Sequence, residues 1–287
     1  MSNDVTLLPK LAGVCGWPIH HSLSPVIHNY WLKESGLSGA YIPFVVRPDE
    51  AKRAFQSLKQ TSISGVNVTL PLKREAFLAA DECTPEAKKL GVANCLYKRD
   101  GKLIGHNTDL EGFTRPLLKH FDAKRLAHSS VLLVGAGGAA KAVIGALLSL
   151  NVPEIRVVNR TDEKAEKLVE SLNLPSVVFT PWSDKQNYVV PSDILVNATS
   201  AGMAGYPALD ISLTGMNKDS LVYDLIYTPR VTPLLKDAQK QGCKTLGGLE
   251  MLIAQARPSF RLFFGETASP DSDPSEVLYS ALKSGIR

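Results

Sequence analysis

Hydrophobic residues follow two different patterns along the chain. In the first part, short apolar runs at 11–16, 41–46 and 65–70 predict strands, and amphipathic stretches at 26–35 and 50–60 predict helices between them. A hairpin is expected over 94–107, because Asp100 and Gly101 form a favoured turn pair between two strand-like segments. We therefore predict a first lobe that mixes strands and helices.

From about Gly112 the pattern becomes a regular alternation of apolar strands and helical stretches. The predicted strands lie at 131–134, 155–159, 177–180, 194–197, 221–224 and 244–246. Such alternation is typical of a Rossmann-like, doubly wound parallel sheet. A further helix is expected at 249–264, and a polar loop at 269–274 precedes a short final helix. The predicted fold class is α/β with two lobes, in which the C-terminal helices return to the first lobe.

Composition narrows the classes of protein that fit. The 287 residues are 44% hydrophobic, which is enough for two domains with ample cores. The net charge of +4 is mild and no basic run is present, so a small anionic ligand is expected rather than nucleic acid. Neither an export signal nor a membrane span is predicted, since the longest apolar stretch, 131–150, is broken by glycines and Lys141. The cysteines lack metal-type spacing and predict reduced cytoplasmic thiols: Cys15, Cys83, Cys95 and Cys243.

The segment VLLVGAGGAAK at 131–141 reads as a strand, a glycine turn and a helix. Gly135 is expected to make the turn, Gly137 to let the backbone approach a pyrophosphate, and Gly138 with Ala139 to bring the helix close to the strand. The free N–H groups at the helix N-terminus would then bind the phosphates. The alternative is a helix that packs tightly on a strand without a ligand, because the glycine spacing departs from the strict motif.

The next predicted strand supports the nucleotide interpretation and indicates which nucleotide. It ends in Asn159, Arg160 and Thr161, near the point where an NAD site usually carries an acid for the ribose hydroxyl. Arg160 offers a cation for a 2′-phosphate instead. The sequence therefore favours NADP as the cofactor.

Ser22 and Ser24 are separated by one residue, so in an extended segment their hydroxyls would point to the same side and could bind a carboxylate. The alternative for Ser24 is an ordinary helix N-cap followed by Pro25. Lys73 is expected in the first turn of a helix at 74–80, where the helix dipole is unfavourable for its charge. It is well placed there as a proton donor and acceptor, and the alternative is an ordinary surface lysine. For Asp109 the alternative is structural, because Thr108 and Glu111 fit a capping box.

Several blocks in order resemble the shikimate dehydrogenase family across nearly the whole chain. They are 16–25 (GWPIHHSLSP), 65–73 (GVNVTLPLK), 91–94 (GVAN), 105–109 (GHNTD), 197–203 (NATSAGM), 227–229 (YTP), 232–235 (TPLL) and 251–256 (MLIAQA). The resemblance implies NADPH-linked reduction of 3-dehydroshikimate to shikimate, a step toward chorismate and the aromatic amino acids. It implies a substrate-binding catalytic domain over 1–110, an NADP-binding Rossmann domain over 111–247, and C-terminal helices over 248–287 that pack on the first domain.

The resemblance also implies roles for individual residues. Lys73 and Asp109 would be the catalytic pair, with the lysine handling the proton and the aspartate holding it and a substrate hydroxyl. The substrate-binding residues would be Ser22, Ser24, Thr69, Asn94, Asp109, Tyr227 and Gln255. The cofactor-binding residues would be Gly135, Ala136, Gly137, Gly138, Ala139, Asn159, Arg160, Thr161, Lys164, Leu225 and Gly248. Substrate is expected between the lobes, and no metal is expected, because His20, His21 and His28 lack ligand spacing.

The chain departs from the usual family pattern at four positions. Cys95 replaces a threonine, Leu110 and Glu250 replace glycines, and Phe263 stands where tryptophan is frequent. Leu110 is expected to stiffen the hinge between the lobes, since glycine would permit more backbone freedom. These departures leave the dehydrogenase interpretation intact and the exact substrate preference open. The alternatives to a biosynthetic shikimate dehydrogenase are a catabolic quinate/shikimate dehydrogenase and, from a different class, a non-catalytic NADP-sensing module. A monomer or a homodimer is expected for each of these functions.

Overall fold

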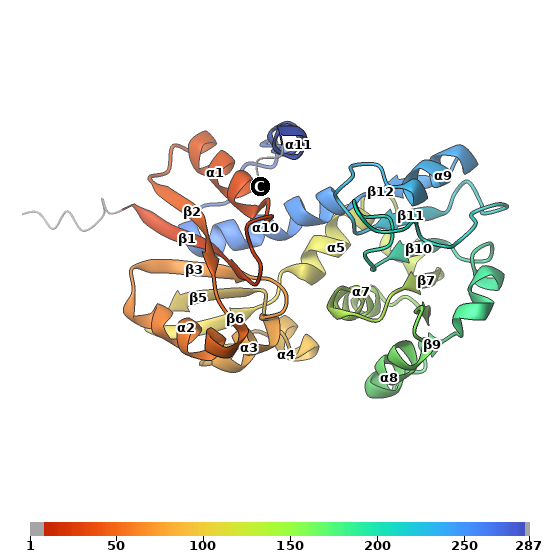
Figure 1. The fold of residues 1–287 in the computed structure, drawn as a ribbon, viewed down its shortest axis with the longest axis horizontal. Helices are drawn as coiled ribbons and strands as arrows, with labels where there is room; N and C mark the ends of the chain where they lie inside the picture. The colour runs from red at the N-terminus through yellow and green to blue at the C-terminus, as the bar shows by residue number, and fades with distance from the viewer. Residues whose placement is uncertain (1–8, 285–287) are drawn as a thin grey trace, which may run out of the picture. The chain divides into compact units, whose positions relative to one another are not determined.

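The computed structural model describes residues 9–284, and it divides the chain into two compact units. The first unit runs up to Asp109 and resumes at Gln255, and the second is Leu110–Ala254. The predicted boundaries lay at 110/111 and 247/248, so residues 248–254 belong to the second unit rather than to the C-terminal segment. Figure 1 labels most of the elements of both units.

The first unit is built on a mixed sheet of six strands. Their order is β2-β1-β3-β5-β6-β4, in which β1 pairs with β2 and β3 in parallel, β5 pairs antiparallel with β3 and β6, and β4 pairs with β6 in parallel. The strands are β1 (Lys10–Gly16), β2 (Gly39–Val45), β3 (Ile63–Val68), β4 (Glu82–Cys83), β5 (Cys95–Arg99) and β6 (Lys102–His106). The predicted hairpin is β5-β6, and its turn residues Asp100 and Gly101 have φ of 51° and 76°, as a type I′ turn requires.

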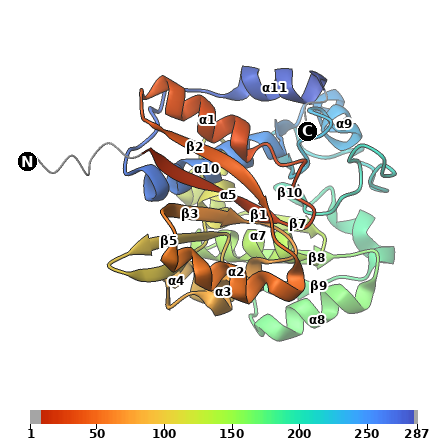
Figure 2. The ribbon, with the colours of Figure 1, turned by 60° about the vertical axis from the view of Figure 1, so that its left-hand side comes forward.

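Helices cover both faces of this sheet. On one face, Phe55 of α2 (Ala51–Ser57) and Ala76 of α3 (Lys73–Ala79) join a buried cluster with Val66 of β3, and Figure 2 shows these two helices side by side. On the other face, Gly65 of β3 lies against Phe263 of α10 (Gly248–Phe264). Apolar residues on both faces bury the sheet and hold the strand ends in place.

The local predictions for the first unit hold with three differences. The helix expected at 50–60 is α2 flanked by two 3-10 segments, Pro48–Glu50 and Leu58–Gln60. The short strand β4 and helix α4 (Pro85–Leu90) were not predicted, although Thr84 caps α4 and Gly91 ends it at φ 66°. The remaining helices are α1 (Ser24–Glu34) and α11 (Ser275–Ser284).

The second unit contains the predicted doubly wound sheet. Its order is β12-β11-β10-β7-β8-β9, and all neighbouring strands are parallel. The strands are β7 (Ser130–Val134), β8 (Glu154–Val158), β9 (Val177–Phe179), β10 (Ile194–Asn197), β11 (Leu221–Asp224) and β12 (Lys244–Leu246). The strand order reverses between β7 and β10, and in such sheets ligands bind beyond the carboxyl ends of the strands at that point.

Helices precede the first strand of the second unit and connect its later strands. They are α5 (Asp109–Leu117), α6 (Ala123–Leu126), α7 (Gly138–Ser149), α8 (Asp162–Leu172) and α9 (Pro233–Gln241), with a 3-10 segment at Trp182–Tyr188. No helix within residues 9–284 is long and apolar enough to cross a membrane.

Candidate functional site

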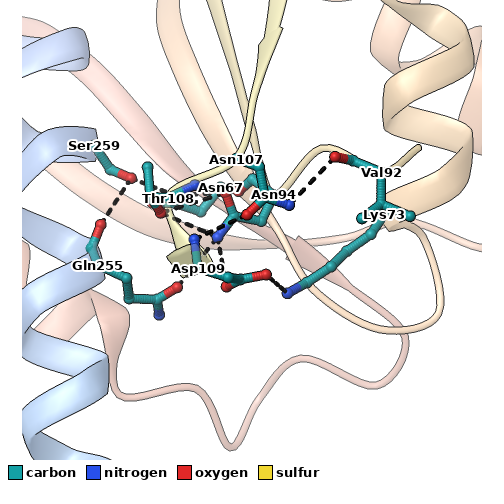
Figure 3. Close-up of polar contacts among 9 residues, drawn as sticks. All are labelled: Asn67, Lys73, Val92, Asn94, Asn107, Thr108, Asp109, Gln255 and Ser259. Atoms are coloured by element: carbon teal, nitrogen blue, oxygen red, sulfur yellow. Dashed lines mark hydrogen bonds and ion pairs between the residues drawn. The ribbon is translucent and has the colours of Figure 1, made fainter. Parts of the chain in front are cut away.

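Four of the predicted site residues of the first unit form one hydrogen-bonded cluster (Figure 3). Lys73 Nζ donates to Asp109 Oδ2 at 2.6 Å. Asn94 Nδ2 donates to the other carboxylate oxygen, Asp109 Oδ1, at 2.8 Å and to Gln255 Oε1 at 3.2 Å. The residues come from three distant parts of the sequence, so this arrangement depends on the tertiary fold.

Local structure places each member of the cluster. Lys73 begins α3, and Asp109 begins α5 directly after β6. The Asp109 N–H donates to Asn107 Oδ1 at 2.9 Å, and Asn107 Nδ2 donates to the Val92 carbonyl at 3.2 Å. Asn94 lies just before β5, where its backbone N–H donates to the His106 carbonyl at 3.1 Å. The backbone around both side chains is therefore held by hydrogen bonds.

The side chain of Asp109 is 10% exposed, and its carboxylate accepts bonds from two donors. A buried charge needs both an opposite charge and hydrogen bonds, and Lys73 and Asn94 supply them. The Thr108 N–H donates to Asn94 Oδ1 at 2.8 Å, which fixes the orientation of this amide so that its N–H₂ group faces Asp109. In Figure 3 the Nε2 of Gln255 points away from the cluster.

The serine pair is arranged differently from the prediction. Leu23 is helical (φ −87°, ψ −5°), and α1 begins at Ser24, so the segment is not extended and Ser24 is not the N-cap. The Ser22 Oγ instead accepts a bond from the Ser24 N–H at 3.3 Å. The argument from alternation is therefore wrong, although both serines lie at the start of α1. Thr69 follows β3 directly, and its N–H donates to the Cys15 carbonyl at 2.9 Å.

The predicted nucleotide residues all lie in the second unit. Gly135 follows β7 with φ 120°, and a Cβ there would lie 2.9 Å from the Ala198 carbonyl oxygen. Gly137 is the N-cap of α7, and a Cβ on it would meet no atom within 4 Å. Gly138 and Ala139 are exposed, and the buried face of α7 begins at Ala140. The expectation that this pair packs against the strand is thus wrong, but an open helix N-terminus of this kind fits a phosphate.

The remaining nucleotide residues follow the carboxyl ends of β8, β11 and β12. Asn159 Nδ2 donates to the Thr161 carbonyl at 2.8 Å, which shapes the turn that carries Arg160. Arg160 and Lys164 are both exposed. A Cβ on Gly248 would lie 2.1 Å from the Leu225 carbonyl oxygen, so only glycine fits there. Tyr227 also belongs to this unit and is half-buried, and burial raises its pKa.

The structure describes the environment of Cys95 and Glu250, two of the departures from the family pattern, and of the three histidines. Cys95 is fully buried, and desolvation raises the pKa of its thiol. Glu250 is exposed. His28 is fully buried and stacks on Tyr41 with ring centroids 4.0 Å apart, whereas His20 and His21 are exposed. Among residues 9–284 no three His, Cys, Asp or Glu side chains form a candidate metal site.

Sequence reasoning missed three residues of the cluster. Thr108 Oγ1 accepts a hydrogen bond from Asn94 Nδ2, whereas the sequence predicted only a capping role for this threonine. Asn107 accepts from the Asp109 N–H and donates to the Val92 carbonyl, which holds the backbone at Asp109. Ser259 is fully buried in α10 and accepts a bond from Asn67 Nδ2 at 2.8 Å. Its spacing of four residues from Gln255 on one helix was the available signal.

Both parts of the chain match families of known proteins. Residues 14–96 match the family described as shikimate dehydrogenase substrate binding domain, and residues 118–230 match the family described as shikimate / quinate 5-dehydrogenase. A shikimate dehydrogenase (NADP(+)) of Gluconobacter oxydans is 42% identical over 276 residues, covering 96% of this chain and 97% of the relative.

Two solved structures are similar over nearly the whole chain. A Thermus thermophilus shikimate 5-dehydrogenase in complex with NADP(H) and shikimate is 32% identical, with a TM-score of 0.83 over 95% of this chain and 99% of the other. A Corynebacterium glutamicum quinate dehydrogenase in complex with NAD is 29% identical, with a TM-score of 0.84 over 96% and 99% of the two chains. Because the relatives match both units along nearly their full length, this chain belongs to the shikimate dehydrogenase family.

Proposed function

We propose that this protein catalyses the reversible, NADPH-linked reduction of 3-dehydroshikimate to shikimate, as a cytoplasmic enzyme of aromatic biosynthesis. The observation that carries the proposal is the contact of 2.6 Å between Lys73 Nζ and Asp109 Oδ2. An ammonium group held on a buried carboxylate, with amide donors beside it, is suited to move a proton at a hydroxyl or carbonyl oxygen.

The residues of the first unit would bind and orient the substrate. Ser22 and Ser24 would hold its carboxylate, and Thr69 lies at the carboxyl end of the neighbouring strand β3. Asn94 and Gln255 would hold the ring hydroxyls through neutral hydrogen bonds, and Tyr227 of the second unit would add another. Orienting the substrate in this way lowers the entropic part of the barrier.

In the direction of reduction, Lys73 would donate a proton from its ammonium group to the 3-oxygen as negative charge develops there. Asp109 would keep Lys73 in place and accept a hydrogen bond from a substrate hydroxyl. The neutral amine would then take a proton from water, which restores the starting state. In the reverse direction the neutral amine would accept the hydroxyl proton.

The second unit carries the residues that fit NADP. Backbone N–H groups after Gly137 would hold the pyrophosphate, and Arg160, with Lys164 nearby in sequence, would bind the 2′-phosphate. Leu225 and Gly248, whose backbones are in contact, would line another part of the NADP site. The chemistry that bound NADPH supplies is a hydride from C4 of its nicotinamide.

Two alternatives remain to be tested against this proposal. A quinate/shikimate dehydrogenase would accept quinate and favour NAD, and the quinate dehydrogenase among the similar structures is a complex with NAD. Arg160 favours the phosphorylated nucleotide instead. An NADP-sensing module without catalysis would not need the cluster of Lys73, Asp109, Asn94 and Gln255.

A spectrophotometric assay separates these functions. Purified protein is given shikimate or quinate with either NADP⁺ or NAD⁺, and absorbance of the reduced nicotinamide is followed. The proposal expects turnover of shikimate with NADP⁺ as the best combination. A better rate with quinate and NAD⁺ would assign the catabolic function, and an absence of turnover in all four combinations would favour the sensing module.

A further inference from the structure

A ring of hydrogen bonds lies behind the Lys73–Asp109 pair and involves two residues without a catalytic role so far, Asn67 and Ser259. Asn67 Nδ2 donates to Ser259 Oγ at 2.8 Å and to the Asn94 carbonyl at 3.2 Å. Ser259 Oγ donates to the Gln255 carbonyl at 3.4 Å. Asn94 Nδ2 donates to Gln255 Oε1, which closes the ring (Figure 3).

The orientation of the Asn67 amide is determined without ambiguity. A backbone carbonyl only accepts, so the side of the amide that faces the Asn94 carbonyl must be its N–H₂ group. The Oδ1 on the other side accepts from the Tyr41 hydroxyl at 2.8 Å. Tyr41 is fully buried and stacks on His28. Asn67 is thus held rigidly and presents a fixed donor to Ser259.

The ring contacts α10, a helix that lacks one of its backbone hydrogen bonds. Pro258 lies inside α10 and has no N–H, so the carbonyl four residues earlier, that of Ala254, lacks its helical donor. Gln255 is the next residue. The bond from Asn67 of β3 to Ser259, one turn along α10 from Gln255, ties this part of the helix to the sheet.

We infer that Ser259, anchored by Asn67, is a positioning residue that sets the Gln255 side chain for substrate binding. Gln255 Oε1 is then occupied by Asn94, and Nε2 is left to donate to a substrate hydroxyl. Without the Ser259 hydroxyl, the partly buried Asn67 amide loses one acceptor, and α10 loses a bond to β3 near Gln255. The inference rests on the proposed function, because it assumes that Gln255 contacts shikimate.

A double-mutant cycle on shikimate oxidation tests this inference. We would measure kcat and KM for shikimate at saturating NADP⁺ in wild type, Ser259→Ala, Gln255→Ala and the double variant. Ser259→Ala is expected to raise KM about tenfold and to change kcat less than about threefold. The double variant is expected to match Gln255→Ala, because the inference assigns the effect of Ser259 on substrate binding to that side chain.

Ser129→Ala is the matched control. Ser129 is 2% exposed and donates to the carbonyl of Arg125, also four residues earlier, at 2.8 Å, but it lies in the second unit. The KM of Ser129→Ala for shikimate is expected to stay at the wild-type value. Thermal unfolding of each variant is recorded, and Ser259→Cys, which keeps the volume with a weaker acceptor, enters the same cycle if Ser259→Ala does not fold.

The outcomes separate this inference from the proposed function. A wild-type protein without shikimate turnover overturns the proposed function. An active wild type in which the effects of the two single variants on KM multiply, or in which the KM of the Ser259 variant is unchanged, overturns the role of Ser259 alone.

Discussion

Asp224 is a buried carboxylate whose ionisation should make the stability of the second unit depend on pH. It ends β11, is 0% exposed, and accepts bonds from Asn197 Nδ2 at 3.0 Å, the Ile226 N–H at 3.1 Å and the Thr232 hydroxyl at 2.6 Å. Desolvation raises its pKa to about 6, against the lowering effect of those hydrogen bonds. Asp224 thereby joins the ends of β10 and β11 to the loop that carries Leu225 and Tyr227.

The direction of this pKa change determines whether stability rises or falls with pH. The folded state binds a proton at about pH 6, whereas an unfolded aspartate binds it near pH 3.9, so folding disfavours the ionised form. The stabilising contribution of Asp224 is therefore fully present below about pH 4 and is lost as pH rises through about 6. A difference of about two pKa units between the folded and unfolded states corresponds to about 3 kcal/mol of stability, and relaxation around the carboxylate would reduce this contribution.

Asp224→Asn removes this titration and retains a side chain of similar shape that can donate to Thr232. We would measure the free energy of unfolding by urea titration for both proteins between pH 4 and 7.5. Wild type is expected to lose about 2 to 3 kcal/mol relative to the variant over that range. Asp219→Asn, at an exposed position of the same unit, controls for the loss of one charge. A stability difference between wild type and Asp224→Asn that does not change with pH would refute the reasoning.

Three further results are expected. Arg160→Ala should weaken NADP binding by about one to two decades while NAD binding changes little, since a charge-assisted contact to phosphate is lost; equal losses in titrations with both nucleotides would contradict this role. Shikimate should exceed quinate in kcat/KM by about tenfold or more with NADP⁺, because the additional hydroxyl of quinate would be buried without a partner, and steady-state kinetics that favour quinate would show a partner for that hydroxyl. Burial lowers the pKa of His28 to about 3, so the stabilising contribution of the neutral His28 should be lost as pH falls below about 6.5, and wild type should lose more stability than His28→Phe over that range; identical acid unfolding curves would contradict this.

Much of the fold could be predicted from periodicity. The parallel strands of the second unit are buried on both faces and are bounded by glycines and helices, so their apolar runs were visible in the sequence. The strand β4 and helix α4 were missed because each is only a few residues long, too short for periodicity. The error at Ser22 and Ser24 has another cause: the segment between β1 and α1 turns rather than extends, and alternation holds only for extended backbone.

The candidate site could be predicted in its members but not in its connections. Lys73, Asn94, Asp109 and Gln255 were identified through family motifs, whereas no local pattern indicated that Asn94 donates to both Asp109 and Gln255. Ser259 and Asn67 lie 192 positions apart. Bonds of that kind depend on tertiary packing of α10 on the sheet, which one sequence does not encode in any local signal.

The most direct test of the account is the turnover of Lys73→Ala, because the account assigns the transferred proton to this side chain. Shikimate oxidation with saturating NADP⁺ is measured for the variant and for Lys88→Ala, a change at an exposed lysine of α4. We expect kcat to fall by about 10² to 10⁴ fold in Lys73→Ala with little change in KM, and to stay at the wild-type value in Lys88→Ala. A folded Lys73→Ala protein with near wild-type kcat would contradict the account.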